Sequence, residues 1–217
     1  MKRDFLALAQ VSSDDISSLL QRAKFMEDAI SGANKTLDIL KGKSMVTLFY
    51  ENSTRTRCSF ELAGKYLGAQ TVGITTSGSS VKKGESLIDT AVTLDKMQAD
   101  VIVIRHSVAG APALIAKHVR ASVINGGDGL HAHPTQALLD MYTMQKTFGS
   151  LKGLEVAIIG DVKHSRVAQS NIVGLSKMGA KVKVFAPNTL MPKGIETQPC
   201  VVCKNAKEAF EGSDVIM

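Results

Sequence analysis

Donor groups are concentrated in residues 53–57, which read STRTR and carry three hydroxyls and two guanidinium groups. The segment follows an apolar run at residues 45–50 and precedes residues with helical spacing. A helix N-terminus presents unpaired N–H groups and the positive end of the helix dipole, so it attracts anions. Capping by Ser53 would use only one hydroxyl, whereas the fork of Arg55 suits phosphate. We interpret the cluster as an oxyanion site.

Two further segments could supply positive charge. Arg105 ends the apolar run VIVI at residues 101–104, where a parallel sheet places its ligands. Residues 79–86, SSVKKGES, are small and flexible around Ser79, Ser80 and Lys83. A solvated strand-end arginine and a solvated turn are the alternative interpretations.

A glycine-rich segment, NGGDGLHAHPTQ at residues 125–136, ends in a helix start at Pro134. His133 lies at the mouth of that helix and Gln136 one turn in. His131 and His133 also resemble the HxH pair of metal hydrolases, but such pairs need an extended strand, and no carboxylate-rich motif follows. We therefore favour His133 as a hydrogen-bond donor to a carbonyl and expect no metal.

A second strand-to-helix turn, GDVKHSR at residues 160–166, follows the apolar run EVAII. A dinucleotide site would need G-x-G-x-x-G, and Lys163 and Ser165 interrupt that pattern. The turn instead presents Arg166, which is either a ligand-binding group or a solvated arginine at a helix start.

The elements that position these residues alternate between strand and helix, which predicts an α/β fold with parallel sheets flanked by helices. We expect two domains, residues 1–149 and 150–217, the second of them incomplete. After a first helix at 12–30, capped by Ser12 or Ser13, the expected strands are 45–50, 71–75, 100–105, 122–125, 155–160, 181–186 and 214–217. The expected helices are 54–67, with Phe60, Ala63, Tyr66 and Leu67 facing inward, and 86–97, 111–118, 134–148, 167–178 and 205–211.

Composition limits the class of protein. The 217 residues carry a net charge of +6 and are 44% hydrophobic, which suffices for sizeable cores. We find no apolar run of membrane-spanning length and no signal-peptide pattern, so we expect a cytoplasmic protein. Basic runs with interleaved aromatic residues are lacking, which argues against nucleic-acid binding. Three cysteines, including the pair in CVVC at 200–203, favour reduced thiols over a metal or redox site.

Five segments in this order resemble the transcarbamoylase family. They are LFYENSTRTRCSFE (48–61), GESLIDT (84–90), VIVIRH (101–106), NGGDGLHAHPTQALLDMYT (125–143) and AIIGDVKHSRVAQSN (157–171). The form NGGDG and the lysine of VKKGES are similar to the family's aspartate branch. The resemblance implies transfer of the carbamoyl group of carbamoyl phosphate to the amino group of L-aspartate, in pyrimidine synthesis, without a metal or organic cofactor.

The resemblance also implies roles for individual residues. The groups that would hold phosphate are Ser53, Thr54, Arg55 and Thr56. Thr56, Arg105 and His133 would contact the carbamoyl oxygen, Gln136 would orient the carbamoyl amide, and Arg166 would receive a carboxylate of aspartate. Lys83, with Ser79 or Ser80, would come from the adjacent subunit of a homotrimer with shared active sites. The resemblance also suggests regulatory or dihydroorotase subunits as possible partners.

The sequence departs from the family at its end, because the family's further aspartate-binding segment does not follow Met217. We therefore expect the 217 residues to bind carbamoyl phosphate, to turn over aspartate poorly and to be marginally stable. The alternatives are an ornithine carbamoyltransferase, a non-catalytic carbamoyl-phosphate-binding fragment, and a metal hydrolase.

Overall fold

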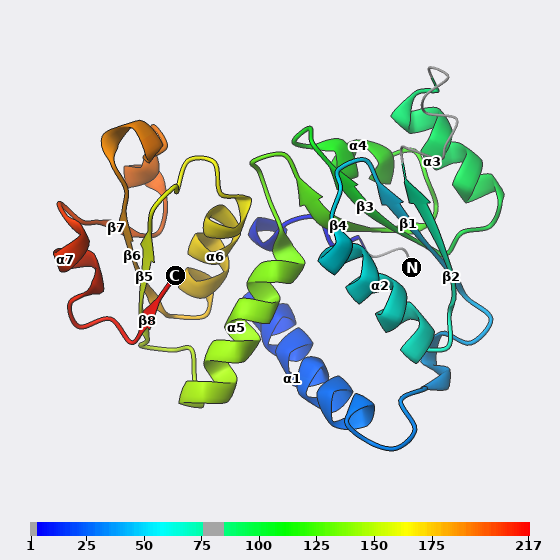
Figure 1. The fold of residues 1–217 in the computed structure, drawn as a ribbon, viewed down its shortest axis with the longest axis horizontal. Coiled ribbons are helices and arrows are strands. Elements are labelled where there is room, and N and C mark those ends of the chain that lie inside the picture. Colours follow the sequence, from blue (N-terminus) through cyan, green and yellow to red (C-terminus); the bar gives the residue numbers. More distant parts are fainter. Residues whose placement is uncertain (1–3, 76–84) are drawn as a thin grey trace. The chain divides into compact units, whose positions relative to one another are not determined.

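The computed structural model describes residues 4–75 and 85–217 and contains two parallel sheets, each flanked by helices (Figure 1). Contacts divide the chain into two compact units. The first comprises the described residues of Met1–Leu6 and Lys24–Gly129, and the second comprises Ala7–Ala23 and Leu130–Met217. The predicted α/β class is confirmed. The boundary that we expect between the two domains, at residues 149 and 150, stays a prediction.

The first unit is built on a parallel sheet of order β2-β1-β3-β4. Its strands lie at the expected places and, except for β4, end within one residue of them. The elements are β1 (Ser44–Phe49), α2 (Thr54–Tyr66), β2 (Gln70–Thr75), α3 (Leu87–Lys96), β3 (Val101–His106), α4 (Ala111–Ala116) and β4 (Ser122–Asp128), with a short 3-10 turn η2 (Asp38–Leu40).

The two faces of this sheet are covered by different helices. Side chains of α3 and α4, such as Leu94 and Ile115, pack with Ile102 and Ile104 of β3 on one face. On the other face, Phe60 of α2 packs against a cluster that includes Met45 and Val103. Strands β1, β3 and β4 therefore have buried centres, whereas the edge strand β2 has no buried residue. Ligands of such a sheet bind beyond the carboxyl ends of its strands.

The predicted inward face of α2 is partly wrong. Ala63 is exposed, and Gly64 is the buried residue of the helix. A Cβ atom at Gly64 would lie 2.5 Å from Met45 Cε and 2.5 Å from Thr71 Cγ2. The helix approaches the sheet so closely at this point that a larger residue would push Met45 and Thr71 aside.

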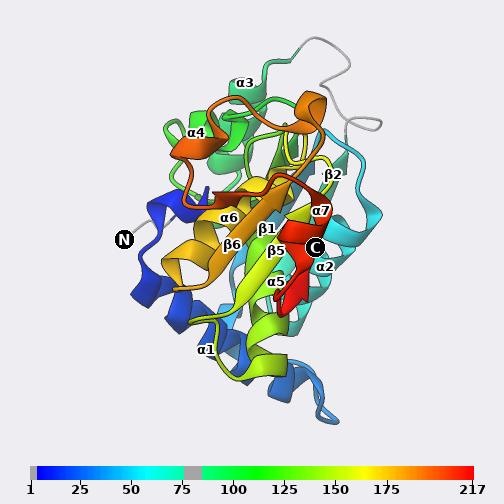
Figure 2. The same cartoon turned by 90° about the vertical axis from the view of Figure 1, so that its left-hand side faces the viewer.

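The second unit holds a parallel sheet of order β7-β6-β5-β8. Helices α6 and α7 lie on opposite faces of the sheet (Figures 1 and 2). The elements are η1 (Leu8–Gln10), α5 (Pro134–Phe148), β5 (Glu155–Ile159), α6 (Arg166–Lys177), β6 (Lys181–Phe185), η5 (Asn188–Leu190), η6 (Ile195–Thr197), β7 (Val201–Val202), α7 (Ala206–Phe210) and β8 (Val215–Ile216). Helix α1 (Ser13–Ile30) begins in this unit and continues into the first.

Helix α6 is joined to the segment near the N-terminus by a lysine and a glycine. Lys177 Nζ donates hydrogen bonds of 2.8 Å each to the carbonyl oxygens of Leu8, Ala9 and Val11. The buried Leu8 side chain lies against Gly174 of α6, where a Cβ atom would be 2.7 Å from Leu8 Cδ1. These contacts fix residues 8–11 on the second unit.

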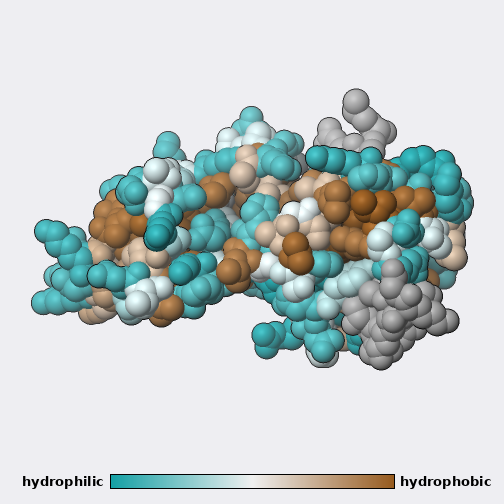
Figure 3. All heavy atoms as spheres, turned by 90° about the horizontal axis from the view of Figure 1, so that it is seen from above, coloured by the Kyte–Doolittle hydropathy of each residue, from teal (hydrophilic) through white to brown (hydrophobic). Residues whose placement is uncertain are grey.

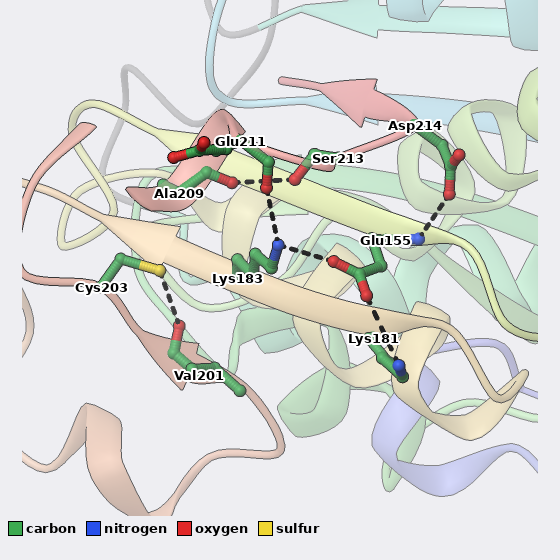
Figure 4. Close-up of polar contacts among 9 residues, drawn as sticks. All are labelled: Glu155, Lys181, Lys183, Val201, Cys203, Ala209, Glu211, Ser213 and Asp214. Atoms are coloured by element: carbon green, nitrogen blue, oxygen red, sulfur yellow. Dashed lines mark hydrogen bonds and ion pairs between the residues drawn. The ribbon is translucent and has the colours of Figure 1, made fainter. Parts of the chain in front are cut away.

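Charged side chains tie the strands of the second sheet together (Figure 4). The carboxylate of Glu155 on β5 pairs with Lys183 at 2.6 Å and with Lys181 at 3.4 Å, both on β6. Lys183 Nζ also donates to the carbonyl oxygen of Glu211 at 3.0 Å. The neighbouring lysines therefore hold the pKa of Glu155 below its ordinary value. The cluster links two strands to the turn that follows α7.

Apolar side chains on the surface form several separate groups among hydrophilic ones on the face drawn in Figure 3. Met97, with 73% of its area exposed, is the most exposed of the large hydrophobic residues that the structure describes. Scattered exposure of this kind is ordinary for a folded protein. None of the described helices is long and apolar enough to cross a membrane.

Candidate active site

The STRTR segment forms the start of α2, as predicted. Ser53 is the N-cap residue with an extended backbone, and its Oγ accepts a hydrogen bond from Thr56 N at 3.4 Å. The first turn of α2 contains no acidic residue, whereas α1 has Asp14 and Asp15 in its first turn. A cation such as the exposed Arg55 is unfavourable beside the positive end of a helix unless an anion joins it. The local electrostatics therefore favour binding of an external anion here.

Arg105 lies at the same edge of the first sheet. Its Cα pairs in register with Phe49, the last residue of β1, and its carbonyl oxygen accepts from Tyr50 N at 2.8 Å. Only 11% of the Arg105 side chain is exposed. The first unit thus brings together Arg105 and the end of the strand that leads into STRTR.

A carboxylate that our sequence interpretation missed is paired with Arg105. Glu51 Oε1 lies 2.5 Å from Arg105 Nη2, and Arg105 Nη1 donates to the carbonyl oxygen of Gly126 at 3.3 Å. The sequence contained a signal, because Glu51 lies two residues after the end of β1 and the parallel register places the ends of β1 and β3 side by side. The guanidinium is held in place before a ligand arrives.

His133 lies at the N-terminus of α5, where it was expected. It is the N-cap residue, only 6% of it is exposed, and Pro134 begins the helix. Its backbone N–H donates to Ser170 Oγ at 2.9 Å. Thr135 Oγ1 lies 3.4 Å from His133 Nδ1. The hydrogen bond to Ser170 holds the backbone of His133, and burial and the contact with Thr135 restrict its imidazole ring.

Ser170 connects this histidine to Arg166. Arg166 is the first residue of α6, after the N-cap Ser165, and its carbonyl oxygen accepts from Ser170 Oγ at 2.8 Å. Because Ser170 Oγ also accepts from His133 N, the second unit brings Arg166 and His133 close together. Sequence reasoning missed Ser170, whose spacing of four residues from Arg166 marks one helical turn.

Gln136 contacts Asp140, which in turn links α5 to α6. Its Nε2 donates to Asp140 Oδ1 at 2.9 Å, and Asp140 Oδ2 accepts from Asn171 Nδ2 at 2.7 Å. Ser79, Ser80 and Lys83 lie outside the described residues, so their predicted roles stay predictions.

The described residues contain no group of three or more His, Cys, Asp or Glu side chains that could hold a metal ion. His131 is exposed, and His133 belongs to a helix cap rather than to a strand. Cys200 and Cys203 are both free thiols, and burial raises the pKa of each.

The family model described as "Aspartate/ornithine carbamoyltransferase, carbamoyl-P binding domain" matches residues 3–146. The chain therefore belongs to the aspartate/ornithine carbamoyltransferase family.

Relatives on the aspartate branch match nearly the whole chain. The aspartate carbamoyltransferase catalytic subunit of Moorella thermoacetica is 55% identical over 99% of this chain and 70% of its own length. That of Ruminiclostridium cellulolyticum is 54% identical over 99% of this chain and 69% of its own length.

Among solved structures, aspartate transcarbamoylase from Trypanosoma cruzi with carbamoyl aspartate and phosphate is similar, with a TM-score of 0.88 and 34% identity. The match covers 99% of this chain and 74% of that one. The catalytic subunit from M. jannaschii gives a TM-score of 0.86 at 35% identity, covering 100% of this chain and 72% of that one.

Proposed function

We propose that this chain transfers the carbamoyl group of carbamoyl phosphate to the amino group of L-aspartate, giving N-carbamoyl-L-aspartate and phosphate. The observation that carries the proposal is the acid-free first turn of α2, with Ser53 and Arg55, beside the pre-positioned Arg105. The T. cruzi protein, which is similar over 99% of this chain, has been solved with carbamoyl phosphate and aspartate.

In the reaction, the aspartate amine attacks the carbamoyl carbon, a C–N bond forms, the bond from that carbon to the phosphate oxygen breaks, and the amine proton passes to the departing phosphate. Charge grows first on the carbamoyl oxygen and then on the departing phosphate. Donors fixed beforehand at those two places lower the barrier, because they need no rearrangement when the charge develops. A site rich in donors and poor in acceptors meets this requirement.

We assign the roles as follows. The phosphate is held by the donors at the start of α2, which are Ser53, Thr54, Arg55 and Thr56. The carbamoyl oxygen is polarised by Thr56, Arg105 and His133. Gln136 orients the carbamoyl amide, and Arg166 pairs with a carboxylate of aspartate.

We further propose that the protein works in the cytoplasm as a homotrimer in which Lys83, with Ser79 or Ser80, enters the active site of a neighbouring subunit. The family resemblance supports this assembly. Mixing inactive Lys83→Ala and His133→Ala subunits tests it, because hybrid trimers contain some sites with neither lesion. Activity should partly return on mixing. A mixture that stays inactive after verified subunit exchange would show that each subunit works alone.

The decisive experiment for the function compares Arg55→Ala with Arg57→Ala. Both arginines lie in the first two turns of α2, but Arg57 faces Glu61, with its Nε 3.7 Å from Glu61 Oε1. Arg55→Ala should weaken carbamoyl phosphate binding, measured by calorimetry, by about tenfold or more, because it removes a charged hydrogen-bond donor. Arg57→Ala should change it little.

Turnover gives the second readout. Losing a donor to developing charge costs roughly a hundredfold to a thousandfold in rate. In a version as long as its relatives, Arg55→Ala should therefore reduce carbamoyl-aspartate formation by that factor. Product should form with aspartate and not with ornithine as the acceptor. Near-normal turnover in a folded Arg55→Ala protein, or a preference for ornithine, contradicts the proposal.

A further inference from the structure

Asp140 lies between two carboxamide side chains of the second unit. One of its oxygens accepts from Gln136 Nε2 at 2.9 Å, and the other accepts from Asn171 Nδ2 at 2.7 Å. Gln136 and Asp140 are both on α5, whereas Asn171 is on α6. The carboxylate therefore joins the proposed amide-binding residue to a second helix.

The chemistry of the carboxylate fixes which way the Gln136 carboxamide is turned. An ionised carboxylate only accepts hydrogen bonds, so the Gln136 end that faces Asp140 must be the NH₂ group. The carbonyl oxygen, Oε1, points away from Asp140 and is the acceptor that the carboxamide can offer to a donor on the ligand. In the flipped orientation two acceptors would face each other, and the hydrogen bond would be lost.

Asn171 holds the carboxylate in turn. It is completely buried, and its Nδ2 also donates to the carbonyl oxygen of Val167 at 3.2 Å. Both partners are acceptors, so the orientation of this amide is fixed as well. Asn171 Oδ1 is buried and finds no donor among the described residues. The Gln136–Asp140 contact on α5 is therefore supported by a buried amide from α6, which holds the carboxylate in one orientation.

We infer that Asp140 is a positioning residue that makes Gln136 present Oε1, and not Nε2, to the ligand. The site then selects a phosphoryl compound whose carbonyl carbon bears an N–H donor over one whose carbonyl carbon bears a methyl group. This inference rests on the proposed function, in which Gln136 meets the amide of carbamoyl phosphate.

Two stable probes test the selection, because they differ only at that position. Phosphonoacetamide carries NH₂ on its carbonyl carbon, and acetonylphosphonate carries CH₃. The full chain should prefer phosphonoacetamide by about tenfold or more in calorimetric titrations, because the methyl group leaves Oε1 without a donor. Inorganic phosphate, which lacks both groups, reports separately on the phosphate-binding residues.

Asp140→Asn is the main variant. An asparagine of the same shape donates as well as accepts, so it also stabilises the flipped Gln136 with Nε2 toward the ligand. The preference for phosphonoacetamide should fall to about threefold or less, while inorganic phosphate binds as before. Asp140→Glu retains an acceptor-only group and should restore most of the preference. A role in stability alone would weaken the binding of all three probes together and leave the preference unchanged.

The outcomes are distinct. An unchanged preference in folded Asp140→Asn protein overturns the inference and leaves the proposed function intact. If the Asp140→Asn protein does not unfold cooperatively, the Asp140→Ala variant is tested in its place. A preference for phosphonoacetamide that is unchanged in Asp140→Ala also overturns the inference. A wild-type chain that binds neither phosphonoacetamide nor inorganic phosphate overturns the proposed function, and the inference falls with it.

Discussion

Replacing Lys177 with methionine should loosen the segment that packs behind the His133 loop. In the native protein its ammonium group donates to three backbone carbonyl oxygens, those of Leu8, Ala9 and Val11, at 2.8 Å each. Leu8 and Ala9 also line a cavity of about 170 Å³ together with His131 and Ala132, the two residues before His133. Methionine keeps a similar length and the apolar stem but cannot donate.

The magnitude follows from what happens to the three carbonyl groups. A hydrogen bond to a charged group contributes roughly 1.5–3 kcal/mol, but three that share one ammonium are not additive. Ala9 is exposed, so water replaces the lost donor there, whereas Leu8 is buried. We expect Lys177→Met to lower the free energy of unfolding by about 2 kcal/mol, which corresponds to a fall in Tm of roughly 4–8 °C for a chain of this size.

Urea denaturation followed by circular dichroism measures the free energy, and hydrogen exchange measures protection of residues 8–11. Lys181→Met is the matched control, because Lys181 is 70% exposed and its ion pair with Glu155 spans 3.4 Å. The control should change stability by less than about 0.5 kcal/mol. If Lys177→Met is equally mild, or if residues 8–11 stay protected in it, the three hydrogen bonds do not hold the segment.

Two other changes test the first unit. A Cβ atom at Gly129, where φ is +50°, would lie 2.8 Å from Ala109 N, whereas Gly110, at +84°, has nothing within 4 Å of its Cβ position. Gly129→Ala should therefore cost about 1–3 kcal/mol more than Gly110→Ala in urea denaturation, and equal costs would contradict the packing argument. Burial lowers the pKa of His106 below its ordinary 6.5, and its Nδ1 accepts from Val108 N. The unfolded chain takes up this proton first, so the free energy of unfolding should fall as the pH drops below 6.5, and an NMR titration of the imidazole with a midpoint at or above 6.5 would refute this.

Much of the fold could be predicted because local signals mark the ends of its elements. Helix α5 begins at Pro134 and ends before Gly149, as predicted, because proline has a preset φ and lacks the N–H that a helix start cannot use, and glycine accepts the positive φ of 80° that ends the helix. Strand ends were predictable where an apolar run stops at a polar residue.

Other features depend on contacts that no local signal carries. The glycines of NGGD indicate a turn, yet β4 continues to Asp128. Asn125 Nδ2 donates to Asp128 Oδ1 at 2.7 Å and Gly110 N donates to Asp128 Oδ2 at 2.7 Å, so the segment is held by side chains and by a distant loop. Likewise, Ala63 is exposed because α2 turns the neighbouring Gly64, and not Ala63, toward the sheet.

The candidate site shows the same division. Ser53, Arg55 and Arg105 were predictable because they stand at strand ends and a helix start. Glu51 and Asp140 were missed because their importance lies in the partner each one meets, 54 residues away at Arg105 and 31 residues away at Asn171. Donors that could bind a ligand were therefore easier to predict from the sequence than the residues that position those donors.

The pairing of Glu51 with Arg105 changes how an anion enters this edge of the sheet. The carboxylate neutralises the guanidinium, so the field that an approaching dianion feels at long range is weaker than the number of arginines indicates. Arg105 should therefore contribute little to the dependence of the association rate on ionic strength, which the remaining positive charges set instead. An anion that binds Nη2 of Arg105 therefore competes with Glu51 for that donor group.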